Sequence, residues 1–391
     1  MFDVGRARAG TPGCTDRIHL NNAGAALMTR SVLDTQIDHL ELEGRIGGYE
    51  AAAARSDQVA AVYESIGTLI GADPGEIALV ENATVAWNQA FGSIPLREGD
   101  VVITSEAEYG ANYVAYLKAV QDRGIEIRVV PGDTSGVIDI GALGDAIDGR
   151  TRLIAVTHVP TNGGLVNPAG QIAEVAHRAG VPFLLDAAQS VGQIDIDVTE
   201  IGCDFLATTG RKFLRGPRGT GFLWASRKMM DQTEPPVIDH IGGRWVAADR
   251  YELRADARRY ENWEFNYAAV LGLGAATAEA LDWGMPAIEA RVTTLAGSLR
   301  ARLAAEGFEV FDLGTRRCAI VTTFIPGMEA DTAKEALSAR GINVSVTTPD
   351  STRLDAERRS LPDLLRLSVH YFNTEDELEE AVSALTDLRR G

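Results

Sequence analysis

The chain has 391 residues, a length that predicts two packed domains because a single hydrophobic core rarely grows so large. Its formal net charge of −18 repels nucleic-acid phosphates and anionic membranes, so neither is expected as a partner. No stretch approaches the roughly 20 uncharged apolar residues of a membrane helix, and the first residues lack the apolar segment of a secretory signal. The sequence therefore predicts a cytoplasmic protein.

Short apolar runs alternate with helical patterns between about residues 55 and 225. The runs are mostly apolar on both faces, which is typical of strands buried in a helix-covered parallel sheet. They comprise residues 76–80, 100–105, 125–130, 152–159, 181–187, 203–209 and 219–225. Helices are expected between them, for example from Ala111 to Asp122 and from Gly170 to Arg178. The alternation predicts an α/β fold whose large domain has a mainly parallel seven-stranded sheet.

The C-terminal part has a different pattern, which predicts a smaller α+β domain. A long apolar helix follows Tyr267. The elements expected after it are a helix from Ile288 to Glu306, a strand over residues 318–324, a helix from Asp331 to Arg340, strands near Val344 and Leu365, and a helix from Thr374. We expect a large domain over residues 20–270, a connecting helix over 267–284, and a small domain made of residues 1–19 and 285–391.

Cysteine and lysine are both scarce. The three cysteines are far apart and form no CxxC pair, so neither a disulfide framework nor a metal site is expected from Cys14, Cys203 and Cys318. Only four of the 37 basic residues are lysines, namely Lys118, Lys212, Lys228 and Lys334. Each lysine in such a chain is a candidate for a specific role.

The segment LVENATVAW places a helix start directly after a strand end. The strand is expected to end at Val80 and the helix to begin near Ala83, with Asn82 or Thr84 as its cap. The free backbone N–H groups of such a helix start bind anions, although an ordinary helix cap has the same pattern. The segment is therefore a candidate phosphate site only in combination with other features.

Two residues near strand ends suit the chemistry of an aldehyde cofactor. Asp186 ends an apolar run, where a carboxylate can keep a pyridine nitrogen protonated, although an acid at this place can also cap a turn. Lys212 follows a strand by a few residues, inside a turn rich in glycine. A lysine held there and partly desolvated is a neutral nucleophile able to form a Schiff base, whereas a lone turn lysine is usually solvated. The scarcity of lysine and the nearby Asp186 favour the Schiff-base interpretation.

Arg366 lies on an apolar strand expected in the small domain. Its guanidinium fork can bind a substrate α-carboxylate through two hydrogen bonds, although a single arginine on a strand is more often a solvated edge residue. Lys212, Asp186, the helix start at Ala83 and Arg366 together offer an amine for an aldehyde, a partner for a pyridine nitrogen, a phosphate site and a carboxylate clamp. This set suits amino-acid chemistry on pyridoxal 5′-phosphate (PLP).

The sequence resembles the class V aminotransferase family of fold-type I PLP enzymes, from LNNAGAALM at residues 20–28 to SVHYFNTEDE at residues 368–377. This family includes cysteine desulfurases, isopenicillin N epimerase and the C–S lyases of ergothioneine-type pathways. The resemblance implies a homodimer with shared active sites, in which Lys212 and Asp186 are catalytic. The implied cofactor-binding residues are Ala83, Thr84, Tyr109, Thr161, Asn162, Asp186, Gln189, Thr209, Arg211 and Lys212. The implied substrate-binding residues are Asn22, Gly24 and Arg366, and we expect the pocket for the substrate side chain to include Arg244 and Trp263.

The resemblance also implies individual roles. Lys212 would hold PLP as a Schiff base, and Gln189 would donate to the phenolate oxygen of the cofactor. Tyr109 stands where desulfurases stack a histidine on the ring, and either Thr161 or Asn162 would lie beside that ring. The segment ENWEFN, residues 261–266, stands where a partner subunit usually donates a threonine to the phosphate. Which residue crosses the interface therefore stays open.

The reaction type is left open between elimination, transamination and epimerisation. The segment over residues 344–351 reads VSVTTPDS and lacks the cysteine that desulfurases carry there. From this difference we expect a C–S lyase that acts by β-elimination on an S-linked cysteine conjugate, rather than a persulfide-forming cysteine desulfurase. An aminotransferase or epimerase acting on an amino acid is the alternative, and a non-catalytic regulator or scaffold with this fold is a third.

Overall fold

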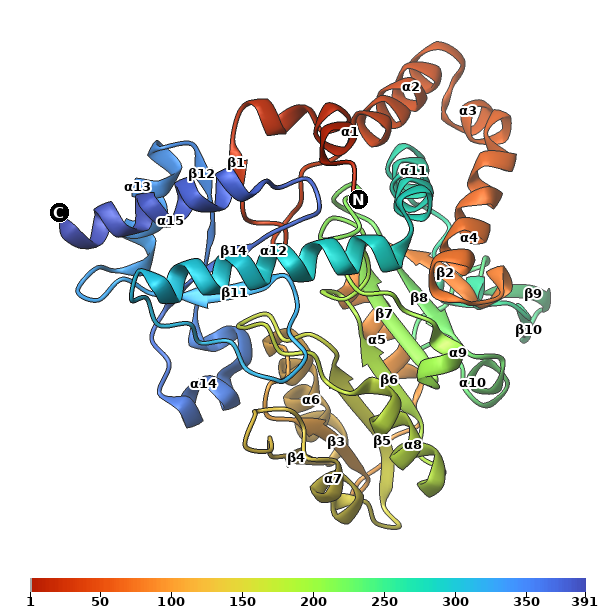
Figure 1. Cartoon of the computed structure of the whole chain (residues 1–391). Coiled ribbons are helices and arrows are strands. Elements are labelled where there is room, and N and C mark those ends of the chain that lie inside the picture. Colours follow the sequence, from red (N-terminus) through yellow and green to blue (C-terminus); the bar gives the residue numbers. More distant parts are fainter. Residues whose placement is uncertain (1) are drawn as a thin grey trace.

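Seven strands form the largest sheet of the computed structural model, which describes residues 2–391 (Figure 1). In spatial order they are β2 (Ile77–Val80), β8 (Gly221–Ala225), β7 (Phe205–Thr209), β6 (Phe183–Asp186), β5 (Thr151–Thr157), β3 (Val101–Ser105) and β4 (Glu126–Val130). Within this sheet β8 runs antiparallel to both of its neighbours, and the other pairings are parallel. The predicted α/β fold with a mainly parallel seven-stranded sheet is confirmed, and each strand falls within its predicted run except β5, which begins one residue earlier.

Both faces of this sheet are buried, which explains why its strands are apolar on both sides. Adjacent residues of one strand, such as Leu184 and Leu185 of β6, belong to two different hydrophobic clusters and have no exposed surface. The helices that connect the strands are α5 (Ala83–Ser93), α6 (Gly110–Arg123), α7 (Ile140–Ala146), α8 (Ala169–Ala179), α9 (Val198–Ile201) and α10 (Arg227–Gln232). Since most strands are parallel, their C-terminal ends lie at one edge of the sheet, where open α/β sheets bind ligands.

A second group of helices packs beside the sheet (Figure 1). The long apolar helix predicted after Tyr267 is α11 (Tyr267–Trp283), and it packs against α2 and α4. The helices before the sheet are α1 (Val4–Ala9), α2 (Arg30–Ile46), α3 (Gly48–Ala54) and α4 (Ser56–Ile70). The longest helix, α12 (Met285–Ala305), leads from α11 toward the C-terminal elements.

The C-terminal elements form a smaller α+β unit around an antiparallel sheet. Its strands are β11 (Ile320–Thr323), β14 (Leu364–Ser368) and β13 (Ser345–Thr347), in that spatial order. Its helices are α13 (Ala330–Ala339), α14 (Arg353–Arg359) and α15 (Glu375–Arg390). The N-terminal strand β1 (Ile18–His19) pairs in parallel with β12 (Ile342–Asn343) of this unit. A small C-terminal unit that includes the first residues agrees with the predicted division of the chain. The exact domain boundaries stay a prediction.

An antiparallel hairpin, β9 (Gly243–Ala247) and β10 (Arg250–Leu253), projects from the large sheet (Figure 1). The sequence analysis did not predict this hairpin. Both of its faces are largely exposed, and the Trp245 side chain is 78% exposed. A strand pair without a buried face has no alternation of apolar and polar residues to reveal it.

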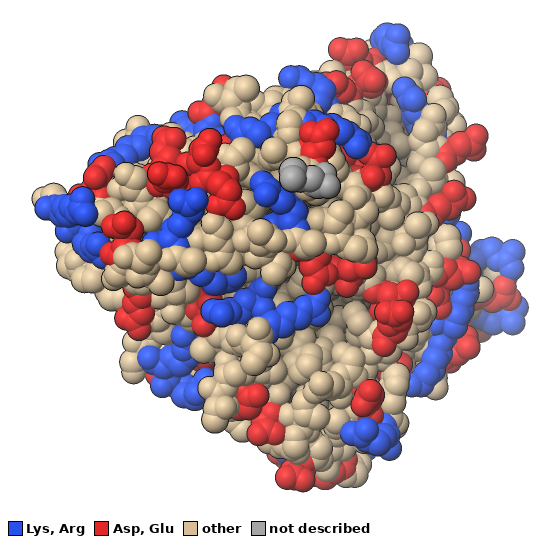
Figure 2. Space-filling view, in the orientation of Figure 1, with Lys and Arg blue, Asp and Glu red and all other residues tan. Residues whose placement is uncertain are grey.

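Acidic and basic side chains are interspersed over the face of the molecule shown in Figure 2, with acidic residues gathered over α15. Charges of both signs are therefore present on that face. Among the helices of residues 2–391, none is both long and apolar enough to cross a bilayer. The cytoplasmic location stays a prediction.

Candidate active site

The predicted site residues Lys212, Asp186, Thr161 and Tyr109 all lie at or just beyond the C-terminal ends of strands in the large sheet. Lys212 follows β7, Asp186 is the last residue of β6, Thr161 follows β5, and Tyr109 follows β3. The four strands are consecutive and parallel in the sheet, so their C-terminal ends converge. The topology therefore brings together residues that are far apart in the sequence.

The loop that carries Lys212 is held by its own backbone. Gly210 donates its N–H to the Thr220 carbonyl at 2.9 Å, and Gly216 donates to the Gly210 carbonyl at 2.8 Å. Arg215 donates its N–H to the Lys212 carbonyl at 2.9 Å and adopts a left-handed conformation with φ 64°. A non-glycine residue in that conformation is strained, so the surrounding contacts must impose it.

Arg215 supplies those contacts through its buried guanidinium, which ties the Lys212 loop to both ends of the chain. Its Nε donates to the Leu27 carbonyl at 2.8 Å, and its Nη2 donates to Thr11 Oγ1 at 2.6 Å. The guanidinium also lies 4.7 Å from the centre of the Phe372 ring. The sequence analysis missed Arg215, because no local pattern distinguishes a buried arginine from a solvated one.

The Lys212 amine is poised to be neutral near neutral pH. Burial lowers its pKa to about 7, the carboxylate of Asp186 opposes this shift, and the positive charges of Arg211 and Arg366 add to it. The Nζ atom lies 6.0 Å from the centre of the Tyr109 ring. A neutral amine is a nucleophile and a base, so this lysine can attack an aldehyde and accept a proton.

Asp186 and Gln189 lie in one buried turn after β6. Asp186 accepts hydrogen bonds from the Ala188 N–H at 2.9 Å and from Asn112 Nδ2 at 2.7 Å. Gln189 donates its Nε2 to the Ala23 carbonyl at 3.2 Å. Its buried Oε1 atom has no hydrogen-bond partner among residues 2–391. A buried polar atom without a partner costs free energy, so it marks a place where a ligand can bind.

The predicted phosphate site is the first turn of α5, which begins at Ala83 as expected. Asn82 caps this helix by accepting the N–H of Val85 at 3.1 Å, and Thr84 is exposed at its first turn. The sequence analysis left the cap open between Asn82 and Thr84, and the structure assigns it to Asn82. The free N–H groups of this turn suit an anion.

Thr209 and Arg211 lie next to that helix start. Gly221 of β8 is paired on one side with Val80, just before α5, and on the other with Thr209, so only Gly221 separates the two in the sheet. Arg211 donates its Nη1 to Thr209 Oγ1 at 3.1 Å. The structure therefore brings the predicted anion-binding groups together.

Arg366 lies on β14 and points toward the same edge of the large sheet. Its Nη1 donates to the hydroxyl of Thr161 and to the Thr161 carbonyl, the latter at 3.4 Å. The buried Nε has no partner among residues 2–391. Burial lowers the pKa of Arg366 to about 10, with Tyr109 raising it and the charge of Arg211 lowering it. A buried guanidinium with a free N–H is suited to bind a carboxylate.

Thr161 and Asn162, which the sequence analysis did not separate, have different surroundings. Thr161 contacts Arg366 and lies 3.4 Å from Gln189 Nε2. Asn162 instead donates its Nδ2 to Thr352 Oγ1 at 2.7 Å and to the Thr348 carbonyl at 3.3 Å. Asn162 therefore joins the large sheet to the segment over residues 347–352, and Thr161 is the better candidate for a ligand contact.

The segment over residues 347–352 also contacts the start of α6. A Cβ atom at Gly110 would lie 2.5 Å from the Asp350 carbonyl oxygen, which is closer than any side chain tolerates. Gly110 follows Tyr109, whose side chain is 38% exposed. The small unit therefore lies directly against the helix start that presents the Tyr109 ring.

Asn22 and Gly24 lie in an N-terminal strip that borders the site. Asn22 donates its Nδ2 to the Ser368 carbonyl at 2.7 Å. The Ala23 carbonyl between them accepts from Gln189, and Ala26 donates its N–H to the Arg211 carbonyl at 2.9 Å. The strip thus contacts the residues beside Lys212 and connects them to β14.

Arg244 and Trp263 are not brought to Lys212 within this chain. Arg244 lies on the exposed hairpin and pairs with Glu252 at 2.7 Å. Trp263 packs at a tilt against His240, with ring centres 4.5 Å apart, and is 47% exposed. The substrate contacts predicted for Arg244 and Trp263 stay predictions. These two residues lie on a different surface of this chain from the one around Lys212.

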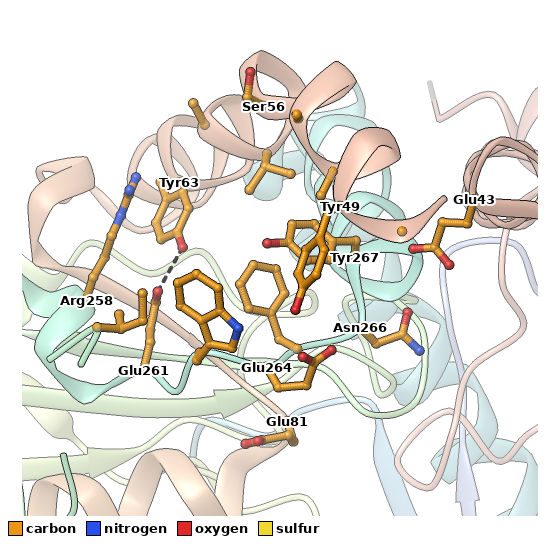
Figure 3. A pocket seen from close by; sticks show the side chains of 18 of the residues that line it. Glu43, Tyr49, Ser56, Tyr63, Glu81, Arg258, Glu261, Glu264, Asn266 and Tyr267 are labelled. Carbon is orange, nitrogen blue, oxygen red and sulfur yellow. Dashed lines mark hydrogen bonds between the residues drawn. The ribbon is translucent and has the colours of Figure 1, made fainter. Parts of the chain in front are cut away.

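Trp263 borders a groove with a volume of about 1120 Å³ between α2, α3, α4 and the segment over residues 261–267 (Figure 3). Its lining is rich in aromatic side chains, including Tyr49, which is 75% exposed. Figure 3 shows Tyr63 donating to the buried Glu261 carboxylate, at 2.9 Å, on one side of the groove. Burial raises the pKa of Glu261 to about 7. Glu81, just before α5, lies at its floor.

The three cysteines are buried. Cys203 precedes β7 and therefore lies at the edge of the sheet opposite to Lys212, and Cys318 lies just before β11 rather than inside the predicted strand. Burial raises the thiol pKa of Cys318 to about 11 and also raises those of Cys14 and Cys203. All three thiols are therefore protonated at neutral pH.

Comparison with known proteins gives consistent similarities. Residues 18–381 match the family described as aminotransferase class-V. A probable cysteine desulfurase of Methanothermobacter thermautotrophicus is 31% identical, over 85% of this chain and 84% of the relative. The apo structure of a cysteine desulfurase from Thermococcus onnurineus NA1 has a TM-score of 0.92 at 22% identity, covering 99% and 98% of the two chains. A structure of C-DES with glycine covalently linked to its PLP cofactor has a TM-score of 0.87 at 19% identity, covering 97% and 99%.

Proposed function

Because this chain belongs to the aminotransferase class-V family, we propose that it is a PLP-dependent cysteine desulfurase. The observation that carries the proposal is the similarity of most of the chain to curated relatives named as cysteine desulfurases or probable cysteine desulfurases. The convergence of Lys212, Asp186 and Arg366 at one sheet edge supports it, since these groups suit an amino acid bound to PLP.

The sequence analysis expected a C–S lyase acting on S-linked conjugates, and this prediction is wrong. The aminotransferase and epimerase alternatives are wrong as well. The argument against a persulfide-forming desulfurase is also wrong. The relatives named as cysteine desulfurases overturn them. The sequence analysis used one segment, residues 344–351, to exclude a whole reaction. The groups that hold and activate the amino acid lie elsewhere, around Lys212, so a difference in that segment was too narrow a basis.

The residues of the site fit PLP. The neutral amine of Lys212 suits the aldehyde, and the buried carboxylate of Asp186 suits the ring nitrogen. The unpartnered Oε1 of Gln189 marks space for a ligand in the same buried turn. The first turn of α5, with Thr209 and Arg211 beside it, suits the phosphate.

The pKa of Lys212 gives a testable pH dependence. The protonated amine is not a nucleophile, so covalent capture of PLP by the apoenzyme is expected to increase as the pH rises through about 7. A free lysine would instead require a pH near its ordinary pKa of about 10.4. The capture rate is measured by the visible absorption that appears when PLP is added to apoenzyme at a series of pH values.

An Arg211→Gln variant is the control for this prediction. It removes a positive charge that lowers the pKa of Lys212, so the pH at which PLP capture reaches half of its maximal rate is expected to rise. A half-maximal pH above about 9 in the unmodified protein would mean that Lys212 is solvated and is not the nucleophile.

Each site residue has a defined task in the proposed reaction. When bound, PLP accepts the electron pair that is released at the α-carbon of the amino acid. Arg366 binds the α-carboxylate, Asp186 holds a proton on the ring nitrogen, and Lys212 removes the α-proton and returns protons to the carbon skeleton. The Cβ–S bond of cysteine breaks while an acceptor thiol forms an S–S bond, so the products are alanine and a persulfide of the acceptor.

The function is tested by incubating the PLP-loaded protein with L-cysteine and a small thiol as acceptor. Alanine and reducible sulfur are expected in equal amounts, because one Cβ–S bond breaks for each alanine formed. Formation of pyruvate and ammonia in place of alanine would contradict the proposal. A Lys212→Ala sample measures the background reaction of free PLP with cysteine.

Arg366→Lys is expected to raise KM for L-cysteine strongly, by roughly 10- to 100-fold, because a point charge cannot reproduce a buried bidentate hydrogen bond. The kcat value should change less, since the clamp binds the carboxylate in the ground state as well as in the transition state. Steady-state kinetics at saturating PLP separate the two parameters. An unchanged KM would assign the carboxylate to another residue.

We also propose that the protein is a homodimer, with the groove in Figure 3 in the interface. Exposed apolar and aromatic side chains line it, among them Leu40, Tyr49 and Trp263. Such a surface is typical of a subunit contact. Glu81 at its floor precedes the phosphate-binding turn of α5, so a second copy there would lie beside the cofactor. Light scattering should give twice the chain mass of 41.8 kDa.

A further inference from the structure

Asn112 connects two buried carboxylates at the edge of the large sheet. It is near the start of α6, and its Nδ2 donates to Asp186 Oδ2 at 2.7 Å and to Glu108 Oε1 at 3.0 Å. Both N–H groups of the amide are therefore used. The three side chains are almost completely buried, with exposed fractions of 4% for Asn112, 5% for Asp186 and 3% for Glu108.

Glu108 is surrounded by hydrogen-bond donors. Thr104 Oγ1 donates to its Oε2 at 2.6 Å, and the Tyr116 hydroxyl lies 3.4 Å from the same atom. Its Oε1 accepts from the Tyr109 N–H at 2.7 Å, from the Thr157 hydroxyl and from Asn112. Burial, opposed by the threonine hydrogen bonds and strengthened by the charge of Asp186, raises the pKa of Glu108.

This arrangement determines which way the Asn112 amide faces. An asparagine side chain can rotate to exchange its oxygen and its NH₂ group, and the oxygen would repel the Asp186 carboxylate. Because Glu108 Oε1 accepts the second N–H, the NH₂ group is the one that faces both acids. Glu108 therefore ensures that Asp186 receives a donor.

The same arrangement leaves Asp186 able to bind the ring nitrogen. Its Oδ1 accepts the Ala188 N–H and its Oδ2 accepts Asn112, so the carboxylate is fixed at both oxygens. Each carboxylate oxygen can accept two hydrogen bonds, so capacity remains for one more donor. Donors to a buried carboxylate favour its ionised form, which is the form that keeps a pyridine nitrogen protonated.

We infer that Asn112, oriented by Glu108, is a positioning residue that holds the Asp186 carboxylate directed at the ring nitrogen of PLP. This inference rests on the proposed function only in requiring bound PLP. It assigns to Glu108 and Asn112 a task that the sequence analysis did not foresee, since that analysis assigned a role only to Tyr109 in this segment.

The test uses full-length protein loaded with PLP that carries ¹⁵N in its ring, so that the ¹⁵N chemical shift reports directly whether the nitrogen is protonated. Asn112→Leu removes the donor at similar size, and Asn112→Ala removes it without added bulk if leucine prevents folding. In both variants the ring nitrogen is expected to lose its proton at a lower pH than in the unmodified protein. L-cysteine turnover is expected to fall roughly 10- to 100-fold, as for other residues that orient a reacting group.

Two Glu108 variants separate positioning from a merely structural role. Glu108→Gln keeps an oxygen for Asn112, and its NH₂ group can donate to the hydroxyls of Thr104 and Tyr116, which accept as well as donate. It should therefore leave the ¹⁵N shift almost unchanged. Glu108→Leu removes the acceptor, so it should reproduce the effect of Asn112→Leu. Lys118→Ala, an exposed position on the same helix, is the matched control.

The outcomes distinguish this inference from the proposed function. If the protein desulfurates cysteine and the Asn112 variants keep the ring nitrogen as protonated as before, the inference is overturned and the function stands. If the variants change the ¹⁵N shift but neither they nor the unmodified protein turns over cysteine, the inference stands and the proposed function fails. A protein that takes up no PLP would overturn both.

Discussion

Lys212→Ala is expected to lower turnover of L-cysteine by roughly 10³-fold or more, because one side chain both captures the cofactor and moves the α-proton. The other lysines are unsuited to replace it, since each forms an ion pair away from the site. Lys118 pairs with Asp122, Lys228 with Asp204, and Lys334 with Asp331. Steady-state assays with the thiol acceptor measure the loss.

Borohydride reduction tests the same assignment without an activity measurement. In the unmodified protein, reduction followed by digestion should give a single labelled peptide that contains Lys212. In Lys212→Ala no peptide should be labelled, although PLP can still bind through the α5 turn. A Lys228→Ala variant should behave like the unmodified protein. Label on Lys118, Lys228 or Lys334 would assign the cofactor to a different lysine.

Asp186→Ala is expected to reduce kcat by roughly 10²- to 10³-fold, which corresponds to about 3–4 kcal/mol of lost transition-state stabilisation. Without the carboxylate, the ring nitrogen has no partner that holds its proton. The buried amide of Asn112 also loses its acceptor, which should lower the free energy of unfolding by about 1–3 kcal/mol. Comparing kcat with the midpoint of thermal unfolding separates the two effects.

The isosteric variant Asp186→Asn provides the second arm of this experiment. It preserves the size of the side chain but places an NH₂ group or a neutral oxygen where the charge was. If charge is what matters, it should be nearly as slow as Asp186→Ala while unfolding at a higher temperature. Near-normal turnover in either variant would show that Asp186 is a structural residue of the turn.

The large sheet and most of its site could be predicted because the signals are local. Strands such as β6 and β7 are buried on both faces and read as continuous apolar runs, and Asp186 and Lys212 stand at or just beyond their ends. The order of the strands then brings their ends together. Arg215 and Asn112 could not be predicted, because their roles depend on partners 204 and 74 residues away.

The reaction type was predicted wrongly for a related physical reason. The segment at residues 344–351 joins the site through Asn162, which contacts Thr347 and Thr348, and through Gly110, and neither contact is visible in the sequence. Its residues were therefore interpreted only by the absence of the cysteine that desulfurases carry there. Trp263 and Arg244 illustrate the same limit, since Trp263 lines the groove in Figure 3 and Arg244 pairs with Glu252 on the exposed hairpin.

The strip over residues 20–26 has a consequence for how the protein is made. Its neighbours include Asn343 and Ser368, so backbone hydrogen bonds join the beginning of the chain to its end across more than 300 residues. During synthesis these partners emerge last, and contacts of such long range form late in folding. The strip that contacts Gln189 and Arg211 therefore cannot adopt its final position until the chain is nearly complete. A nascent chain released early would contain Lys212 and Asp186 but not the finished site, so stable cofactor capture should mark full-length molecules.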